Sequence, residues 1–170
     1  KLGYPLVMKV VGPVHKSDVG GVVLNVKTEE QVVKEFKRMM KIPETTAILL
    51  QPMLSGTELF VGAKYEPKFG HLILCGMGGI FIEVLKDISA GLAPVSEEES
   101  LKMIRNLKSY KIIQGIRGQS GIDEYRFAGI IQSVSALVMA APEIAELDLN
   151  PLLGKATEVV AVDARIRIEK

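Results

Sequence analysis

The chain has 170 residues, 48% of them hydrophobic and 24% charged, which is the composition of a well-packed folded protein. Its 21 Lys and Arg residues nearly balance its 20 Asp and Glu residues, so the net charge gives no reason to expect a nucleic-acid partner. The single cysteine, Cys75, excludes an internal disulfide and a cysteine-based metal cage and favours a reducing cytoplasm, and no apolar run reaches the length of about 18 residues that suggests a membrane span.

The first segments predict two strands. The chain starts at Lys1 without an initiator methionine or a signal sequence, so we expect it to be a piece of a longer polypeptide that lacks its N-terminal segment. Residues 5–11 predict a buried strand, residues 12–21 a polar loop, and residues 22–26 a second strand.

A helix is predicted next, from Thr28 to the helix-stopping Pro43. Thr28 and Gln31 have the spacing of a capping box, in which a hydroxyl and an amide satisfy the first backbone N–H groups. Its apolar positions make one stripe, which consists of Val32, Val33, Phe36, Met39 and Met40.

The rest of the chain predicts a sheet followed by helices. Four strands of an antiparallel meander are predicted, at residues 47–54, 57–65, 71–77 and 80–87. Ser96 and Glu99 form a second capping-box pattern, for a helix reaching about Leu107. A third helix, ended by Pro142, is indicated by the apolar positions Phe127, Ile130, Ile131, Val134, Leu137 and Val138.

These elements predict an α+β protein with two parts, residues 1–46 and residues 47–170. The segment where they meet has no linker composition. We therefore expect the two parts to lie on either side of a cleft.

Two polar residues near the C-terminal end predict a cation site. If the chain turns back after Asn150, then Asn150 faces Asp163 and Asp148 faces Arg165 on antiparallel strands. Both oxygen ligands then share one face. An amide oxygen beside a carboxylate suits magnesium and the phosphates that it carries, which points to nucleotide chemistry.

Lys9 lies in an otherwise apolar strand. An ammonium group cannot be buried there without a partner, and a phosphate in the cleft would supply one. The alternative is an edge strand on which Lys9 points to solvent.

Two glycine-containing loops could bind an anion. Gly20 and Gly21 follow His15, and paired glycines let backbone amides approach a phosphate while a histidine could accept a phosphoryl group. A plain turn with a surface histidine explains the same residues. Residues 76–79 are likewise either an anion-accommodating turn or a tight hairpin, because no P-loop pattern follows them.

Further charged residues have two interpretations each. Glu58 and Glu83 could face the cleft or lie on the solvent side of the sheet. Arg117, in a glycine-rich loop, is a forked donor suited to phosphate or carboxylate, although such loops are often merely exposed. His71 and Cys75 are interpreted as structural residues.

Taken together, the chain resembles the ATP-grasp domain or β subunit of the NDP-forming acyl-CoA synthetases. That family includes ADP-forming acetyl-CoA synthetase and, more distantly, the succinyl-CoA synthetase β subunit. The resemblance covers nearly the whole chain and rests on the order and spacing of PLVMKVVGPVHKSDVGGVVLNV, LLQPMLSGTELFVGAKYEPKFGHLILCGMGGIFIEVLKD, GIRG, ELDLNPLL and AVDARI.

The resemblance implies a two-lobed ATP-grasp fold and roles for individual residues. Lys9 would contact the phosphates of ATP, Gln51, Pro52 and Met53 would form the hinge beside adenine, and Glu58 would be a further acid of the nucleotide site. Asn150 and Asp163 would hold magnesium. His15 would be a phosphorylated histidine of a relay, and Asp148 would orient it.

The family reaction interconverts acyl-CoA, ADP and phosphate with a carboxylic acid, CoA and ATP. The resemblance implies that CoA binding belongs to a separate α subunit or fused domain, and that small acids or their CoA esters are substrates. No nucleic acid or membrane is implied. Many family members carry an arginine where this chain reads residues 89–94 as SAGLAP, which leaves Arg117 as the local cation.

Two alternatives remain at this point. An ATP-grasp carboxylate–amine ligase would form an acyl phosphate directly and would not need His15. A nucleotide-sensing module of a larger protein would bind ATP without turning it over, but the retention of Lys9, Asn150 and Asp163 favours catalysis.

Overall fold

The computed structural model describes residues 2–13, 16–79, 86–116, 118 and 120–169. It consists of two compact units, Lys1–Ser55 and Gly56–Lys170. The division falls later than the expected boundary after residue 46, because strand β3 (Ala47–Pro52) pairs along its whole length with β1 (Leu6–Val11) of the first unit. No helix among the described residues is long and apolar enough to cross a membrane.

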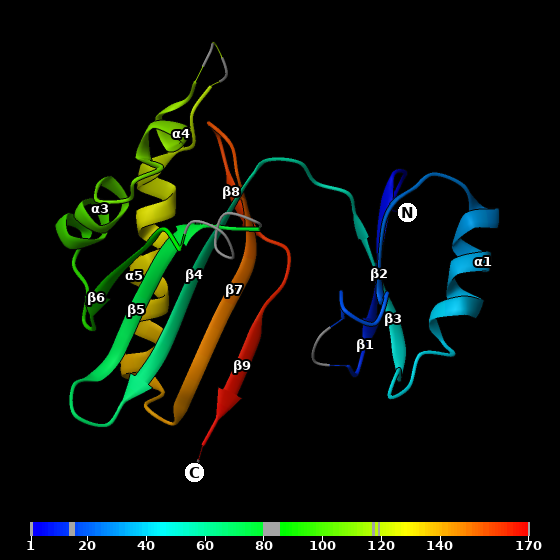
Figure 1. Cartoon of the computed structure of the whole chain (residues 1–170), viewed down its shortest axis with the longest axis horizontal. Helices are drawn as coiled ribbons and strands as arrows, with labels where there is room; N and C mark the ends of the chain where they lie inside the picture. Colours follow the sequence, from blue (N-terminus) through cyan, green and yellow to red (C-terminus); the bar gives the residue numbers. More distant parts are fainter. Residues whose placement is uncertain (1, 14–15, 80–85, 117, 119, 170) are drawn as a thin grey trace. The chain divides into compact units, whose positions relative to one another are not determined.

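The first unit is a sheet with one helix. Its antiparallel strands have the order β2-β1-β3, with β2 spanning Val22–Val26, and α1 spans Glu29–Met39 (Figure 1). Alternate residues of β1 point to one side and form its core. That core consists of Leu6, Met8, Val10, Val26 and Met39.

Helix α1 begins where the sequence predicts, and only part of its apolar stripe is buried. Thr28 Oγ1 accepts a hydrogen bond from the Gln31 backbone N–H at 3.3 Å, while the Gln31 side chain returns to the N–H of Lys27, one residue before the expected partner. Met39 is fully buried, but Val33 and Phe36 are each 46% exposed. The apolar stripe is therefore only partly covered.

The second unit is built on a larger antiparallel sheet. Its strands are β4 (Thr57–Glu66), β5 (Gly70–Met77), β6 (Ile88–Leu92), β7 (Ile144–Gly154), β8 (Val159–Ala161) and β9 (Arg165–Ile168). The order is β6-β5-β4-β7-β8. Strand β9 also pairs with β7, along its first half, whereas β8 pairs with the end of β7. The predicted antiparallel meander is thus confirmed for β4 and β5. The first predicted strand of the meander, β3, instead belongs to the sheet of the first unit. The strand predicted at residues 80–87 falls mostly outside the described residues.

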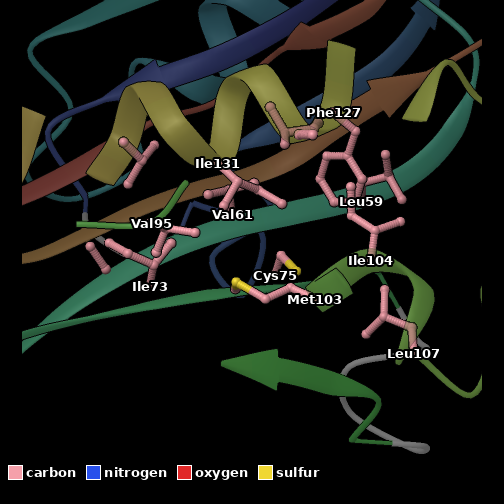
Figure 2. Packing of buried hydrophobic residues seen from close by; sticks show 14 of the residues in the cluster. Leu59, Val61, Ile73, Cys75, Val95, Met103, Ile104, Leu107, Phe127 and Ile131 are labelled. Carbon is pink, nitrogen blue, oxygen red and sulfur yellow. The ribbon is translucent and has the colours of Figure 1, made fainter. Parts of the chain in front are cut away.

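Helices α3 (Glu97–Arg105), α4 (Tyr110–Gln114) and α5 (Glu124–Ala140) belong to the second unit, and α5 runs along β4 and β5 (Figure 1). Figure 2 shows Phe127 and Ile131 of α5 packed over Leu59 and Val61 of β4, with Ile104 of α3 beside them. The capping box of Ser96 and Glu99 is confirmed, with hydrogen bonds of 3.2 and 2.9 Å. Since neighbouring residues of a strand point to opposite sides, Phe60 and Gly62 belong to the other face of the sheet, which we call the outer face.

Candidate functional site

The predicted pairing of the C-terminal strands is present. Asp148 of β7 lies opposite Arg165 of β9, and further along β7 Leu152 lies opposite Ala161 of β8. These two pairs belong to one continuous register, and the N–H of Val162 donates to Pro151 O at 3.1 Å between them. That register puts Asn150 opposite Asp163.

The carboxylates at this point influence each other. Burial raises the pKa of Asp148 above its usual value, the Arg165 guanidinium opposes this rise, and the Asp163 carboxylate adds to it. Asp163 Oδ1 also accepts a hydrogen bond from the N–H of Ala164 at 3.1 Å. A cation placed here would relieve the repulsion between the two carboxylates.

The donor set fits magnesium. Within the described ranges, no group of three or more His, Cys, Asp and Glu residues could hold a metal ion, so a closed structural metal cage is not found there. Magnesium keeps several waters and is usually held by one or two protein oxygens together with substrate phosphates. Asn150 and Asp163 would supply two such oxygens.

Lys9 lies on the central strand of the smaller sheet. Its neighbours are Val22 on β2 and Leu49 on β3, and the residue is only 8% exposed. The edge-strand interpretation was therefore wrong, since β1 is paired on both sides. Along β1 it alternates with Met8 and Val10 of the core, so it belongs to the opposite side of the sheet.

The loop containing Gly20 and Gly21 is closed by its own hydrogen bonds. The N–H of Gly20 donates to Ser17 O at 3.1 Å, and the N–H of Gly21 donates to Lys16 O at 2.7 Å. A side chain at Gly21 would collide with Val10, which gives this glycine a packing reason. A contact of these amides with a nucleotide phosphate stays a prediction, and it would require both hydrogen bonds to open.

The predicted hinge includes the last two paired residues of β3 and the residue after them. Gln51 is opposite Val7 and Pro52 is opposite Leu6, and the N–H of Met53 donates to Pro5 O at 3.0 Å. The segment is therefore extended and fixed to β1. The role of Gln51, Pro52 and Met53 beside adenine stays a prediction.

Glu58 is exposed at the start of β4 and contacts the turn at residues 76–79. Its carbonyl accepts a hydrogen bond from the N–H of Gly78 at 2.7 Å, and a side chain at Gly79, whose φ is +60°, would collide with the Glu58 carboxylate. Close packing thus explains the glycines of this turn. Whether the Glu58 carboxylate serves a nucleotide stays a prediction.

The remaining candidates divide into two groups. His15, Glu83 and Arg117 lie outside the described residues, so their predicted roles stay predictions. His71 and Cys75 are structural, as expected. His71 is buried with Nε2 2.7 Å from Ile144 O, and burial raises the pKa of the fully buried Cys75 to about 12.

The structure also brings together residues that the sequence analysis did not group. A concavity of about 240 Å³ lies on the outer face of the larger sheet. Its charged lining residues are Lys64, Glu146, Asp148, Arg165 and Arg167, and they stand beside Phe60, Gly62 and Leu74. Pairing of the strands produces it, because Leu74, Gly62, Asp148 and Arg165 are successive cross-strand partners. The sequence analysis had paired Asp148 with Arg165, and the glycine amid the apolar residues 57–65 was the other sequence signal.

Comparisons with known proteins identify the family. The ATP-grasp domain family matches residues 1–168. The chain is 39% identical to the Pyrococcus furiosus acetate–CoA ligase (ADP-forming) I subunit beta, over 98% of this chain and 76% of that subunit. It is 42% identical to the Nitrosopumilus maritimus 4-hydroxybutyrate–CoA ligase (ADP-forming), over 95% of this chain but only 25% of that longer protein.

Solved structures of a related synthetase have the same fold as this chain. The dinucleotide-forming acetyl-coenzyme A synthetase 1 of Ca. Korarchaeum cryptofilum, in complex with coenzyme A and Ca-AMPCP, superposes with a TM-score of 0.93 at 36% identity, covering 99% of this chain and 78% of that one. A second complex of that protein holds coenzyme A and Mg-AMPPCP, with its phosphohistidine segment pointing towards the nucleotide binding site; its TM-score is 0.87 at 36% identity, over 98% and 78% of the two chains. With the match over residues 1–168, these likenesses show that the chain belongs to the ATP-grasp domain family and forms the ATP-grasp part of an ADP-forming acyl-CoA synthetase.

Proposed function

We propose that this chain is the nucleotide-binding part of an acid–thiol ligase that converts acyl-CoA, ADP and phosphate into a carboxylic acid, CoA and ATP, and the reverse. The observation that carries the proposal is the register of β7 with the strands that follow it, which sets Asn150 opposite Asp163 on a chain of this family. Magnesium held there would neutralise charge on the nucleotide phosphates.

The protein's own part in this reaction is to position groups and to neutralise charge. Lys9, which is only 8% exposed, would bind the phosphates of ATP or ADP, and Glu58 would be a further acid of the nucleotide site. Gln51, Pro52 and Met53 would support the adenine ring. Gly20 and Gly21 would approach the phosphates if their loop opens.

A histidine relay would carry the phosphoryl group. His15 would take it through its ring nitrogen, and Asp148 would accept a hydrogen bond from the other ring nitrogen and hold the ring in place. Arg117 would supply an additional cation. The related Korarchaeum protein, whose phosphohistidine segment points towards its nucleotide site, supports a relay of this kind.

The CoA-binding part would come from another subunit or a fused domain. The Pyrococcus relative is a beta subunit, which supports a separate partner subunit, and the chain spans only a quarter of the longer Nitrosopumilus ligase, which leaves room there for a fused domain. A reducing cytoplasm is the compartment that we propose, supported by the buried free thiol of Cys75.

The test uses the full-length protein with its CoA-binding part. ATP formation from acetyl-CoA, ADP and phosphate is measured for wild type, Asp163→Asn and His15→Ala. Removal of a ligand charge is expected to lower kcat/KM for ADP at least 100-fold in Asp163→Asn, with partial recovery at raised magnesium, and loss of the relay should abolish activity in His15→Ala.

The control variant is Asn106→Ala, an exposed residue just after α3, which should keep wild-type rates. Full activity of Asp163→Asn at low magnesium would contradict the metal role. Activity that survives in His15→Ala and makes amides from added amines would identify an amine ligase, and nucleotide binding without any turnover would identify a sensing module.

A further inference from the structure

Strand β6 is a free edge of the larger sheet. It comes first in the order β6-β5-β4-β7-β8, and among the described residues it pairs only with β5 (Figure 1). None of its residues from Ile88 to Leu92 is charged. By contrast β9, which pairs only with β7, carries Arg165 and Arg167. Charged side chains hinder the pairing of a sheet edge with another chain, so β6 lacks a common form of protection.

The hydrogen-bonding pattern shows which backbone groups of β6 are free. The N–H of Ala93 donates to His71 O at 2.9 Å, which makes these residues a hydrogen-bonded pair at the end of the β5–β6 ladder. Such pairs alternate with non-hydrogen-bonded ones, so Gly91 also directs its N–H and C=O to β5. Ala90 and Leu92 therefore direct theirs to the free side. No described residue supplies a hydrogen-bond partner there.

A hollow of about 220 Å³ borders this free edge. Ala90 and Leu92 line it on the side of β6, and Lys102 and Met103 line it on the side of α3. An extended peptide can add to a free sheet edge as a further strand, with main-chain hydrogen bonds for affinity and hollows for alternate side chains. The edge and the hollow together offer both kinds of contact.

Gly91 contributes to the space for a guest side chain. It also lines the hollow, and a Cβ atom there would lie 2.8 Å from Met103 Sδ and 3.4 Å from Val95 Cγ2. Residue 91 thus points to the side of the sheet that α3 covers, and the missing side chain leaves that side open. Val95 and Met103 are both buried and give the hollow an apolar lining. An apolar side chain of an added strand would find matching contacts here.

The charges beside the hollow favour an acidic guest. Glu99 and Lys102 are its ionisable lining residues, and both belong to α3. Glu99 Oε2 already accepts a hydrogen bond from the N–H of Ser96 at 2.9 Å. Lys102 is exposed and forms no ion pair within the part of the chain that the structure describes. A carboxylate on the α3 side of an added strand would be its partner.

We propose that the free edge of β6 binds an extended acidic segment of another protein, which adds to the larger sheet as a further strand and places a carboxylate beside Lys102. A second copy of this chain fits less well. Antiparallel pairing of two β6 strands would bring both α3 helices to the same side of the joined sheet, next to the same hollows. The inference is independent of the proposed function, because no residue assigned to the nucleotide site takes part.

Peptide binding to the full-length protein tests the edge. The probe is a capped heptapeptide with valine at its second and sixth positions, glutamate at the fourth and threonine elsewhere, and calorimetric titration measures its affinity. We expect a dissociation constant below about 1 mM for wild type. Ala90→Pro removes the outward N–H, which the sheet does not use, and should weaken binding at least about 10-fold. The matched control Ala90→Val keeps that N–H and should bind within about threefold of wild type.

A second comparison tests the carboxylate. Lys102→Gln should weaken binding of the glutamate peptide about two- to fivefold, because an exposed ion pair contributes modestly, and should not affect a peptide with glutamine in its place. The control is Lys37→Gln, which removes an exposed lysine of α1 in the other unit. Thermal unfolding of each variant checks that it is folded. An equal effect of Lys102→Gln on both peptides would overturn the acidic guest.

Hydrogen exchange gives the location. Bound peptide should slow deuterium exchange in residues 88–92 and leave residues 165–168 unchanged. The inference is overturned if wild type binds no peptide at about 5 mM, if Ala90→Pro and Ala90→Val bind equally, or if sedimentation shows a dimer that Ala90→Pro abolishes, since the edge would then serve a second copy. If the peptide binds as expected while the acyl-CoA reaction is absent, the proposed function fails and the inference stands.

Discussion

At the residue scale, Asp87 is a buried carboxylate with three hydrogen bonds. It is only 4% exposed, yet Oδ1 accepts from the N–H of Lys108 at 2.9 Å, and Oδ2 accepts from the N–H of Ser109 at 2.7 Å and from its hydroxyl. Burial by itself would raise the pKa of Asp87, but these hydrogen bonds outweigh it and hold the pKa below its usual value. The carboxylate thus fastens the start of β6 to the turn after α3.

Replacing Asp87 by Ala should lower the free energy of unfolding by about 3 kcal/mol, because two backbone N–H groups and a hydroxyl lose their partner. Since the folded pKa is lowered, the stabilisation is present above the unfolded value near 4 and is lost as the pH falls through the folded pKa. Urea unfolding from pH 7 to pH 2 measures both effects. Glu98→Gln, an exposed substitution in α3, is the control, and an equal acid loss in wild type and Asp87→Ala would refute the assignment.

At the element scale, side-chain caps mark where helices α1 and α3 begin. Ser96 makes a reciprocal capping box with Glu99, while the cap of α1 uses Thr28 and the N–H of Lys27. Both starts were visible in the sequence, because a cap is a local pattern of three or four residues. The burial of α1 was not visible, because which apolar residues are covered depends on the sheet against which the helix packs.

Ser96→Ala should therefore destabilise the protein by about 1 kcal/mol, the usual cost of losing a serine N-cap. The matched control is Ser133→Ala in α5, where the hydroxyl donates to Gly129 O within the helix and adds little. Thermal unfolding of the two variants at pH 7 makes the comparison. Equal shifts of Tm for both would mean that the capping box does not stabilise α3.

At the scale of the whole molecule, local patterns and long-range pairings were predictable to different degrees. Alternation predicted most strands and the facing of Asp148 and Arg165, since one register follows once the turn is placed. The assignment of β3 to the first sheet was not predictable, because its apolar sequence suits either sheet. The concavity beside Gly62 also depends on pairing among four strands, which spacing along one chain does not reveal.

The two units have separate cores of unequal size, and this predicts unequal local stability. Met8 belongs to the small cluster of the first unit, whereas Val61 belongs to a much larger one shared by β4, β5, β7 and three helices. Opening free energies follow the buried apolar contacts of each cooperative segment. Amides of β1 should therefore exchange with deuterium at a lower opening free energy than amides of β4.

Cavity-forming substitutions test whether this difference belongs to the units. Met8→Ala should lower the opening free energy of β1 by about 2–5 kcal/mol and leave that of β4 within error, because Met8 is fully buried in the small cluster. Val61→Ala should act first on β4. Hydrogen exchange followed by mass spectrometry resolves the two segments in one experiment. If both variants lowered the protection of both strands equally, the chain would unfold as one cooperative body, and the smaller core would not set the stability of the Lys9 strand on its own.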